Sequence, residues 1–358
     1  MDLPYLTADL AGTGGVLRTT DDDFLVDEEP AYAASGTGDH VFVHVEKRGL
    51  TTAMAVAAIA RALGIHERDI GVAGMKDRRA VTRQWLSLPP PVTPEAALAL
   101  AIPDVQLLAA IRHGHKLRTG HVRANRFRLR VRGTTDAAGA RAILERLARP
   151  PGAPNWYGEQ RFGRDGDNAA RGRALLTGER SRDRKRDRLM ISALQSELFN
   201  AWLVARIADG LYARVIPGDV LHKQPGGMFT CEDAAVDEAR LLAGELVATG
   251  PMFGDKMRRA AGLAAEREDA ILAAAGLAHD AWHAVRQIAE GTRRDASIQV
   301  TDVAVEAEAD AIVVAFTLPG GAYATAVMRE VMKSPGPGAA GAGVDPAPED
   351  AARATVAS

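Results

Sequence analysis

Strand-type patterns occur toward both ends of this 358-residue chain and are sparse between them. Apolar and polar residues alternate at 40–45 and at 125–132, and strand patterns return at 298–305 and 311–318. Such alternation is typical of strands with one apolar face. Because a single sheet then draws on both ends of the chain, we expect an α/β (α+β) fold whose mixed-sheet domain is interrupted by an insertion.

The middle of the chain has mainly helical spacing, with apolar residues at helical intervals in 189–208, 234–248 and 277–288. The cluster Pro150-Pro151-Gly152-Ala153-Pro154 favours a boundary, because proline cannot continue the preceding helix. The predicted organisation is a sheet domain from 1–150 plus 298–333 and a mainly helical inserted domain at 151–297. The tail at 334–358, rich in Pro, Gly and Ala, is expected to be disordered.

Composition limits the class of protein. Hydrophobic residues at 47% and charged residues at 25% exclude wholesale disorder and a fibrous repeat. No apolar run approaches the roughly 20 residues that span a bilayer, and the start Met1-Asp2-Leu3-Pro4 lacks the features of a signal peptide. The single cysteine, Cys231, cannot form an internal disulfide and is expected to be a buried thiol. These features predict a cytoplasmic protein with no membrane partner.

A polar loop at 74–79 holds the candidate chemistry, between short strand patterns at 70–73 and 84–88. A free aspartate has a pKa of roughly 3.9, so Asp77 is an anion at neutral pH and needs no partner base to act as a nucleophile. The neighbouring Lys76, Arg78 and Arg79 favour the ionised form and attract phosphate. The competing interpretation is an ordinary charged surface turn.

Other familiar sites are missing from the sequence. It has neither a Gly-x-x-x-x-Gly-Lys-Ser/Thr phosphate loop nor a Gly-x-Ser-x-Gly elbow. His113-Gly114-His115 has no third ligand at a suitable spacing, so we expect no metal there.

At the 74–79 loop the sequence resembles the tRNA pseudouridine synthase D family. The family string Ala-Gly-x-Lys-Asp-(Arg/Lys)-x-Ala-Val-Thr-x-Gln-Trp matches Ala73 to Trp85. Further matching blocks follow in the family's order and span nearly the whole chain up to Glu330. They lie at 23–26, 120–129, 155–163, 192–200 and 318–325.

The resemblance implies an enzyme that isomerises uridine to pseudouridine in tRNA, chiefly at position 13, with Asp77 as the catalytic aspartate and no metal or organic cofactor. Covalent attack by the carboxylate and assisted elimination are both open. Because the target base must leave its stack, the family implies Phe24 as the platform that receives it. Asn125 would bind the uracil edge, although Ala124 stands where the family usually has glycine.

Three more residues join the expected substrate site. Tyr323, where some relatives carry phenylalanine, keeps an aromatic face and gains a hydroxyl. Lys76 is expected beside the catalytic aspartate. Arg329 has two open interpretations: a pairing with Asp77 or phosphate, and an ordinary salt bridge to Glu330 or Asp310.

Basic residues are unevenly distributed although the net charge is −2, and 112–132 holds eight Lys/Arg and three His without one acid. We expect this region and the run 180–188 to contact the RNA backbone. Asp183 and Asp187 lie within the second run, so the competing interpretation is that charges within the run pair with one another. The named candidates are Arg126, Arg128, Arg130, Lys185 and Arg186.

Two rival functions stay open at this point. One is a non-catalytic RNA-binding or RNA-remodelling protein on the same scaffold. The other is a small-metabolite enzyme with a basic sheet. The expected partner is tRNA, and the sequence implies no obligate protein partner.

Overall fold

A computed structural model describes residues 3–163, 165–179 and 183–334 of the chain. Its largest element is a nine-stranded sheet whose main path runs β14-β15-β7-β2-β5-β3-β6, with β1 on β7 and β4 on β5. The strands are β1 (Val16–Leu17), β2 (Phe24–Pro30), β3 (His40–Arg48), β4 (Gly71–Val72), β5 (Val81–Leu88), β6 (Val105–His113), β7 (Val122–Arg132), β14 (Thr301–Ala307) and β15 (Ala311–Pro319).

The sheet joins the two ends of the chain, as the strand patterns predict. Strand β15 runs antiparallel to β7 over nine consecutive partners, from Ala311 opposite Arg132 to Pro319 opposite Ala124. The neighbouring pair β2 and β5 is parallel, with Leu25 opposite Val81. The expectation of a mixed sheet in a mixed α/β fold is confirmed.

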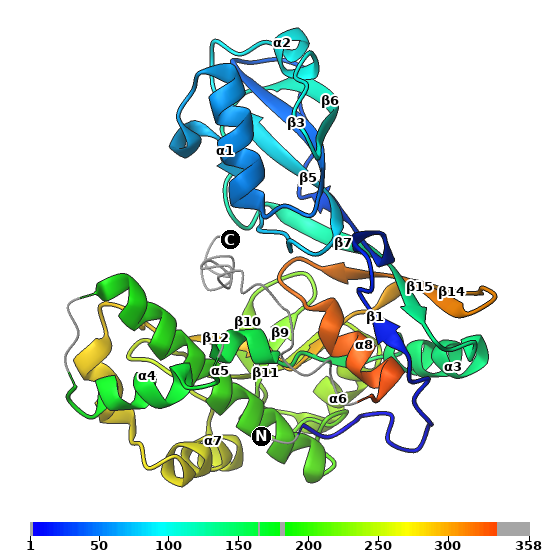
Figure 1. The fold of residues 1–358 in the computed structure, drawn as a ribbon. Helices are drawn as coiled ribbons and strands as arrows, with labels where there is room; N and C mark the ends of the chain where they lie inside the picture. Colours follow the sequence, from blue (N-terminus) through cyan, green and yellow to red (C-terminus); the bar gives the residue numbers. More distant parts are fainter. Residues whose placement is uncertain (1–2, 164, 180–182, 335–358) are drawn as a thin grey trace.

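Four helices cover this sheet: α1 (Thr52–Leu63), α2 (Pro94–Leu98), α3 (Ala137–Leu147) and α8 (Ala324–Met332). The start of α1 is capped by the Thr51 hydroxyl, which accepts a hydrogen bond from the Met54 amide, and Gly64 ends the helix at a φ of 66°. Figure 1 shows α1, α2, β3, β5 and β6 in the upper part of the molecule, and α3, α8, β14 and β15 in the lower part.

Each part has its own apolar core. Ile59 of α1 packs in the upper core with Val43 and Leu86 of the sheet. In the lower core, Leu144 of α3 packs with Phe316 of β15. Strand β7 lies where the two parts meet (Figure 1), so the sheet is continuous between them.

The segment between the two sheet-forming regions is mainly helical and also contains a small sheet. Its elements are α4 (Asn168–Leu176), α5 (Arg184–Ala208), β9 (Val220–Lys223), β10 (Met228–Thr230), α6 (Ala234–Leu242), β11 (Leu246–Met252), α7 (Gly262–Ala274) and β12 (Thr292–Asp295). The four strands pair in the order β10-β9-β11-β12. A short pair, β8 (Ala153–Pro154) with β13 (Ser297–Ile298), lies at the base of the segment.

The hydrophobic periodicity of the sequence did not predict these strands. The helix expected over 234–248 stops at Leu242, and after Gly244 the chain continues as β11. Every residue of β11 is buried, so the strand shows no alternation that would distinguish it from a helix. The helix expected over 277–288 is a 3-10 helix at His279–Val285. Of the expected disordered tail, all residues after Ser334 lie outside the described ranges.

A buried carboxylate connects the start of the chain to the last helix. Glu330 of α8 is fully buried and accepts hydrogen bonds from the amides of Leu6 at 2.9 Å and Thr7 at 3.0 Å, and from the Thr7 hydroxyl at 2.7 Å. Because a buried charge is costly unless it is hydrogen-bonded, these three donors stabilise both segments together.

We predict that Glu330→Gln lowers the free energy of unfolding by about 1–3 kcal/mol, because the new amide group meets backbone donors where the carboxylate accepted them. Urea denaturation measures the change. Glu306→Gln is the control, since the Glu306 side chain is 65% exposed, and we expect it to unfold like the wild type. Equal unfolding free energies for the two variants would contradict the role of Glu330.

Candidate active site

Asp77 lies in the loop between β4 and β5, and hydrogen bonds to the backbone hold that loop in place. The Lys76 amide donates to the Thr52 hydroxyl at 2.8 Å, at the start of α1. The Lys47 ammonium donates to the Asp77 carbonyl at 2.8 Å. Lys47 is 1% exposed, so this contact is shielded from water. The backbone around Asp77 is therefore fixed by β3 and α1 together.

The Asp77 carboxylate is 43% exposed and pairs with the guanidinium of Arg18. Arg18 follows β1 with a φ of 63°, and its guanidinium carbon lies 3.9 Å from the centroid of the Phe24 ring. The cation therefore contacts the carboxylate and an aromatic face at once. Our sequence reasoning missed Arg18. It lies 59 positions before Asp77, and no local motif around it signals that contact.

Phe24 is 2% exposed, with Arg18 over its ring and Phe127 in an edge contact at 6.3 Å. The residue expected to receive a flipped base thus has its ring covered. A base that stacks on the face under Arg18 must first displace that guanidinium.

Lys76 and Asn125 are both neighbours of Glu28 on β2. Lys76 forms a buried ion pair with Glu28 of β2, and Glu28 also accepts the Trp85 amide at 3.1 Å. Asn125 of β7 is opposite Glu28 in the sheet and 9% exposed. Among the described residues none hydrogen-bonds to the buried Oδ1 of Asn125. A buried acceptor without a partner is uncommon, and it suits a ligand N–H.

Tyr323 brings the other end of the chain to the same site. It precedes α8, and its ring lies 6.5 Å from that of Tyr157. Burial raises the pKa of the Tyr323 hydroxyl; Arg294 and Arg161 oppose the rise, and the Asp77 carboxylate adds to it. Tyr323 therefore lies within electrostatic reach of Asp77 and of two arginines from the inserted segment.

Arg329 has a different setting from the ion pairs expected for it. Its guanidinium donates to the Leu3 and Pro4 carbonyls and lies 3.9 Å from the centroid of the Tyr5 ring. In the described part of the chain, no ion pair joins Arg329 to Asp77, Glu330 or Asp310. Arg329 instead holds the N-terminal segment against α8.

Arginine side chains line one face of β7, as expected, and acidic side chains on neighbouring elements pair with them. Arg126 pairs with Glu29 of β2. Arg128 pairs with Glu306 of β14 at 3.0 Å, and Arg130 pairs with Glu308 at 2.8 Å. These pairs reduce the net positive charge that the strand presents to a phosphate backbone.

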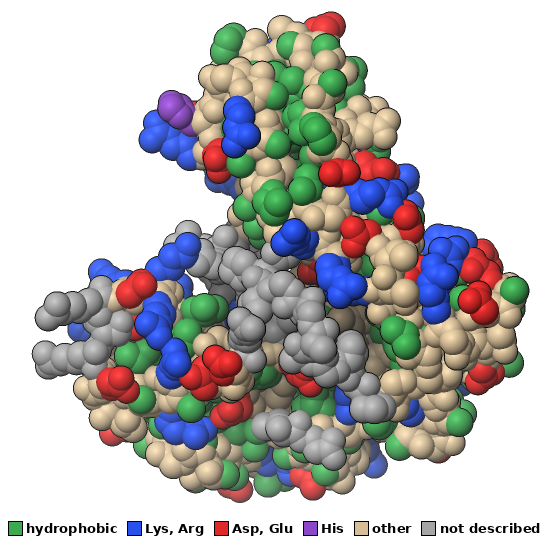
Figure 2. All heavy atoms as spheres, viewed as in Figure 1, with side chains coloured by type: hydrophobic (Ala, Val, Ile, Leu, Met, Phe, Trp, Pro, Cys, Tyr) green, Lys and Arg blue, Asp and Glu red, His purple; other side chains and the backbone are tan. Residues whose placement is uncertain are grey.

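Lys185 and Arg186 lie in the first turn of α5 and are exposed, and the Asp183 side chain accepts both of their amides. Residues 180–182 of the same basic run lie outside the described ranges. Figure 2 shows Lys and Arg side chains on both the upper and the lower part of the molecule near the narrowing between them.

His113, His115 and Cys231, which the sequence also singles out, are packed against other side chains. His113 and His115 lie in a ring cluster with Tyr32, their Nε2 atoms 3.2 Å apart. No set of three or more His, Cys, Asp or Glu within the described ranges is arranged to hold a metal ion. The thiol of Cys231 is buried, which raises its pKa to about 12. That shift makes it a poor nucleophile.

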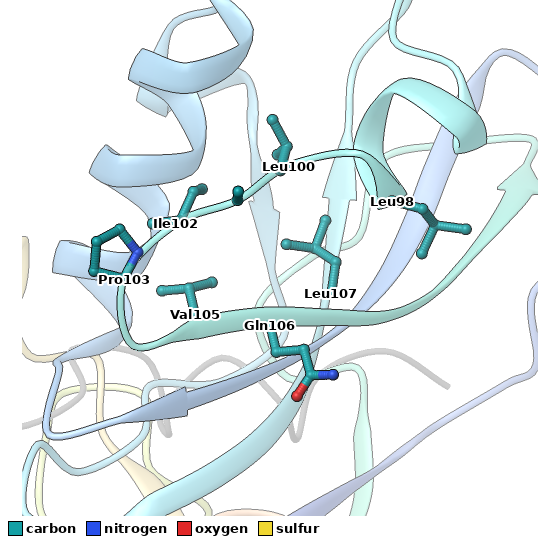
Figure 3. A pocket seen from close by; sticks show the side chains of 8 residues that line it. Leu98, Leu100, Ile102, Pro103, Val105, Gln106 and Leu107 are labelled. Atoms are coloured by element: carbon teal, nitrogen blue, oxygen red, sulfur yellow. The ribbon is translucent and has the colours of Figure 1, made fainter.

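A hollow lies at the edge of the sheet beside β6. It has a volume of about 470 Å³ and is lined by residues 98, 100–103 and 105–107 (Figure 3). None of the predicted site residues lines it. No described helix is long and apolar enough to cross a membrane.

Comparisons with known proteins agree on one family. The family model of tRNA pseudouridine synthase D (TruD) matches residues 1–186 and 180–331. The tRNA pseudouridine synthase D of Anaeromyxobacter dehalogenans (strain 2CP-C) is 53% identical over 341 residues, which cover 93% of this chain and 97% of that relative. The chain belongs to the tRNA pseudouridine synthase D family. Membership in the TruD family makes it an isomerase of the pseudouridine synthase class.

Two further comparisons extend over the same range. A TruD relative from Thermus thermophilus is 43% identical, with 97% of this chain and 96% of the relative covered. A crystal structure of the Methanosarcina mazei protein that carries the TruD name superposes with a TM-score of 0.78 at 22% identity, over 93% of this chain and 99% of that one. The superposition shows that the two chains share the TruD fold.

Lys47→Met provides a test of how the loop that carries Asp77 is held. The variant loses the buried donor to the Asp77 carbonyl, so we predict a decrease of about 1–3 kcal/mol in the free energy of unfolding. Loop displacement should also lower the rate of isomerisation. Thermal unfolding and the rate of pseudouridine formation measure the two effects.

Lys116→Met is the matched control. Lys116 is half-buried, and its ammonium donates to the Arg68 carbonyl at 2.6 Å in an exposed hydrogen bond. We expect the control to retain wild-type stability and rate, and equal behaviour of the two variants would rule out a special role for Lys47.

Proposed function

We propose that this chain converts uridine 13 of tRNA to pseudouridine, with Asp77 as the catalytic carboxylate. The observation that carries the proposal is the convergence of Asp77, Arg18 and Tyr323. The three come from distant parts of the sequence: the Arg18 guanidinium pairs with the Asp77 carboxylate, and that carboxylate acts electrostatically on the Tyr323 hydroxyl. The TruD match over both sheet-forming regions supports the same assignment.

The reaction moves one glycosidic bond. The N1–C1′ bond of uridine breaks, a C5–C1′ bond forms, the hydrogen on C5 leaves as a proton, and N1 takes up a proton. No electrons are gained or lost, so the step needs no redox cofactor. Asp77 acts either by covalent attack or by assisting elimination of the base, and in both routes its carboxylate must be ionised.

The groups around Asp77 suit a detached uracil ring. The amide oxygen of Asn125 accepts the uracil N3–H, and the amide nitrogen donates to a uracil carbonyl. Phe24 and Tyr323 supply aromatic faces, and stacking of a base on such a face contributes roughly 1–3 kcal/mol. This gain offsets much of the few kcal/mol needed to take a base out of its helix. Arg18 moves from Phe24 to a backbone phosphate as the base enters.

The tRNA backbone binds along the basic surface, with Lys185 and Arg186 on α5 and the exposed arginines of β7 as contacts. The β7 arginines exchange carboxylate partners for phosphates, which limits their net contribution. The α5 pair is exposed at a helix start, where the helix dipole also favours an anion.

The decisive test uses tRNA labelled with tritium at uracil C5, since formation of the C5–C1′ bond releases the label. We expect Asp77→Asn to lower the release rate by at least about a thousandfold while tRNA affinity stays close to that of the wild type. Asp27→Asn is the control, because the Asp27 side chain is also 43% exposed. Undiminished release from Asp77→Asn would end the proposal, and tRNA binding without any release by the wild type would favour a non-catalytic RNA-binding protein.

The backbone contacts predict a change in salt dependence. Replacing both Lys185 and Arg186 with alanine should weaken tRNA binding and reduce the slope of log K against log salt by about 1–2, since each phosphate contact contributes roughly 0.7–0.9. Filter binding from 50 to 300 mM KCl, roughly the range where screening is strong, gives the slope. Arg128→Ala removes a single cation, so it should reduce the slope by at most about 0.7–0.9. An unchanged slope in the double variant would exclude the α5 contact.

A further inference from the structure

Met75 is an exposed apolar side chain two residues before Asp77. It is 43% exposed, as is the Asp77 side chain, whereas Lys76 between them points inward to its buried ion pair with Glu28. Because the side chain between them is turned inward, Met75 and Asp77 are both presented to solvent in front of the loop.

The backbone that carries Met75 is held on both sides of it. Before it, the Gly74 carbonyl accepts from the Gln84 amide group at 3.4 Å. After it, the Lys76 amide donates to the Thr52 hydroxyl at 2.8 Å. Met75 is thus an apolar side chain on a fixed support, and its exposure is not the result of a free loop.

The proposed reaction leaves a space that such a side chain fits. When a uridine leaves a helix, its neighbours lose their stacking partner, at a cost of a few kcal/mol. Proteins that open base steps insert apolar side chains such as Met, Leu or Phe between the bases. Methionine is unbranched and polarisable, so it adapts to the faces of neighbouring bases.

We propose that Met75 inserts into the base stack beside the target uridine and occupies the space which that base vacates. Met75 stacks on the neighbouring base while Asp77, on the same side of the loop, reaches the sugar of the extruded nucleotide. The inference rests on the proposed function and adds a positioning residue to it. It assigns the opening of the stack to Met75 and the bond exchange to Asp77.

The test compares two tRNA transcripts in single-turnover assays at saturating enzyme. In one, the target uridine is stacked in its native helix; in the other, deletion of the facing nucleotide makes it an extrahelical bulge that leaves no gap. We expect Met75→Ala to lower the rate about tenfold on the native tRNA, on the scale of one lost stacking contact. On the bulged transcript its rate should match that of the wild type. Met75→Leu should stay within about twofold on both.

Met54→Ala is the matched control, because Met54 is also 43% exposed but lies on α1. It should have the wild-type rate on both transcripts. A wild-type rate for Met75→Ala on native tRNA, or an equal loss on both transcripts, would overturn the inference. Failure of the proposed function is distinguishable, since the wild type itself would then release no label.

Discussion

The antiparallel pairing of β7 with β15 is the contact on which the site depends. Nine consecutive partners join a strand near residue 130 to one near residue 315, across the whole inserted segment. The register sets Leu318 opposite Asn125, so the turn after β15 and the helix start at Tyr323 reach the end of β7 that carries Asn125. Asp77 comes to the same region through β5, which is joined to β7 by β2. Without the pairing, the groups around Asp77 would belong to two separate structures.

Charge in the site is matched at short range. Asp77 faces Arg18, Lys76 is buried against Glu28, and the arginines of β7 each have an acidic neighbour. Ion pairs with partly exposed members contribute little to stability, whereas a buried charge without its partner is costly. At these pairs an RNA phosphate must therefore compete with carboxylates that are already in place. Such competition favours a ligand that offers several phosphates in a fixed geometry.

Much of the architecture could be predicted from the sequence, because the alternation over 40–45 and 125–132 is a local signal. The loop that carries Asp77 could also be singled out, since its residues are consecutive and match a family string. Arg18 and the true surroundings of Arg329 were not, because both depend on contacts between residues far apart in the chain. Strand β11 was missed for a different reason: it is buried on both faces, and a fully apolar strand has no period.

The inserted segment leaves and rejoins the sheet domain at adjacent points. Strands β8 and β13 pair with Ala153 opposite Ile298, and the Asn155 amide donates to the Ala296 carbonyl at 3.0 Å. This pairing holds the two ends of the segment together. A longer or shorter segment therefore changes the entropy cost of loop closure only slightly. Because the two ends of the segment meet at β8 and β13, a change in its length leaves in place the pairing of β7 with β15 that positions the candidate site.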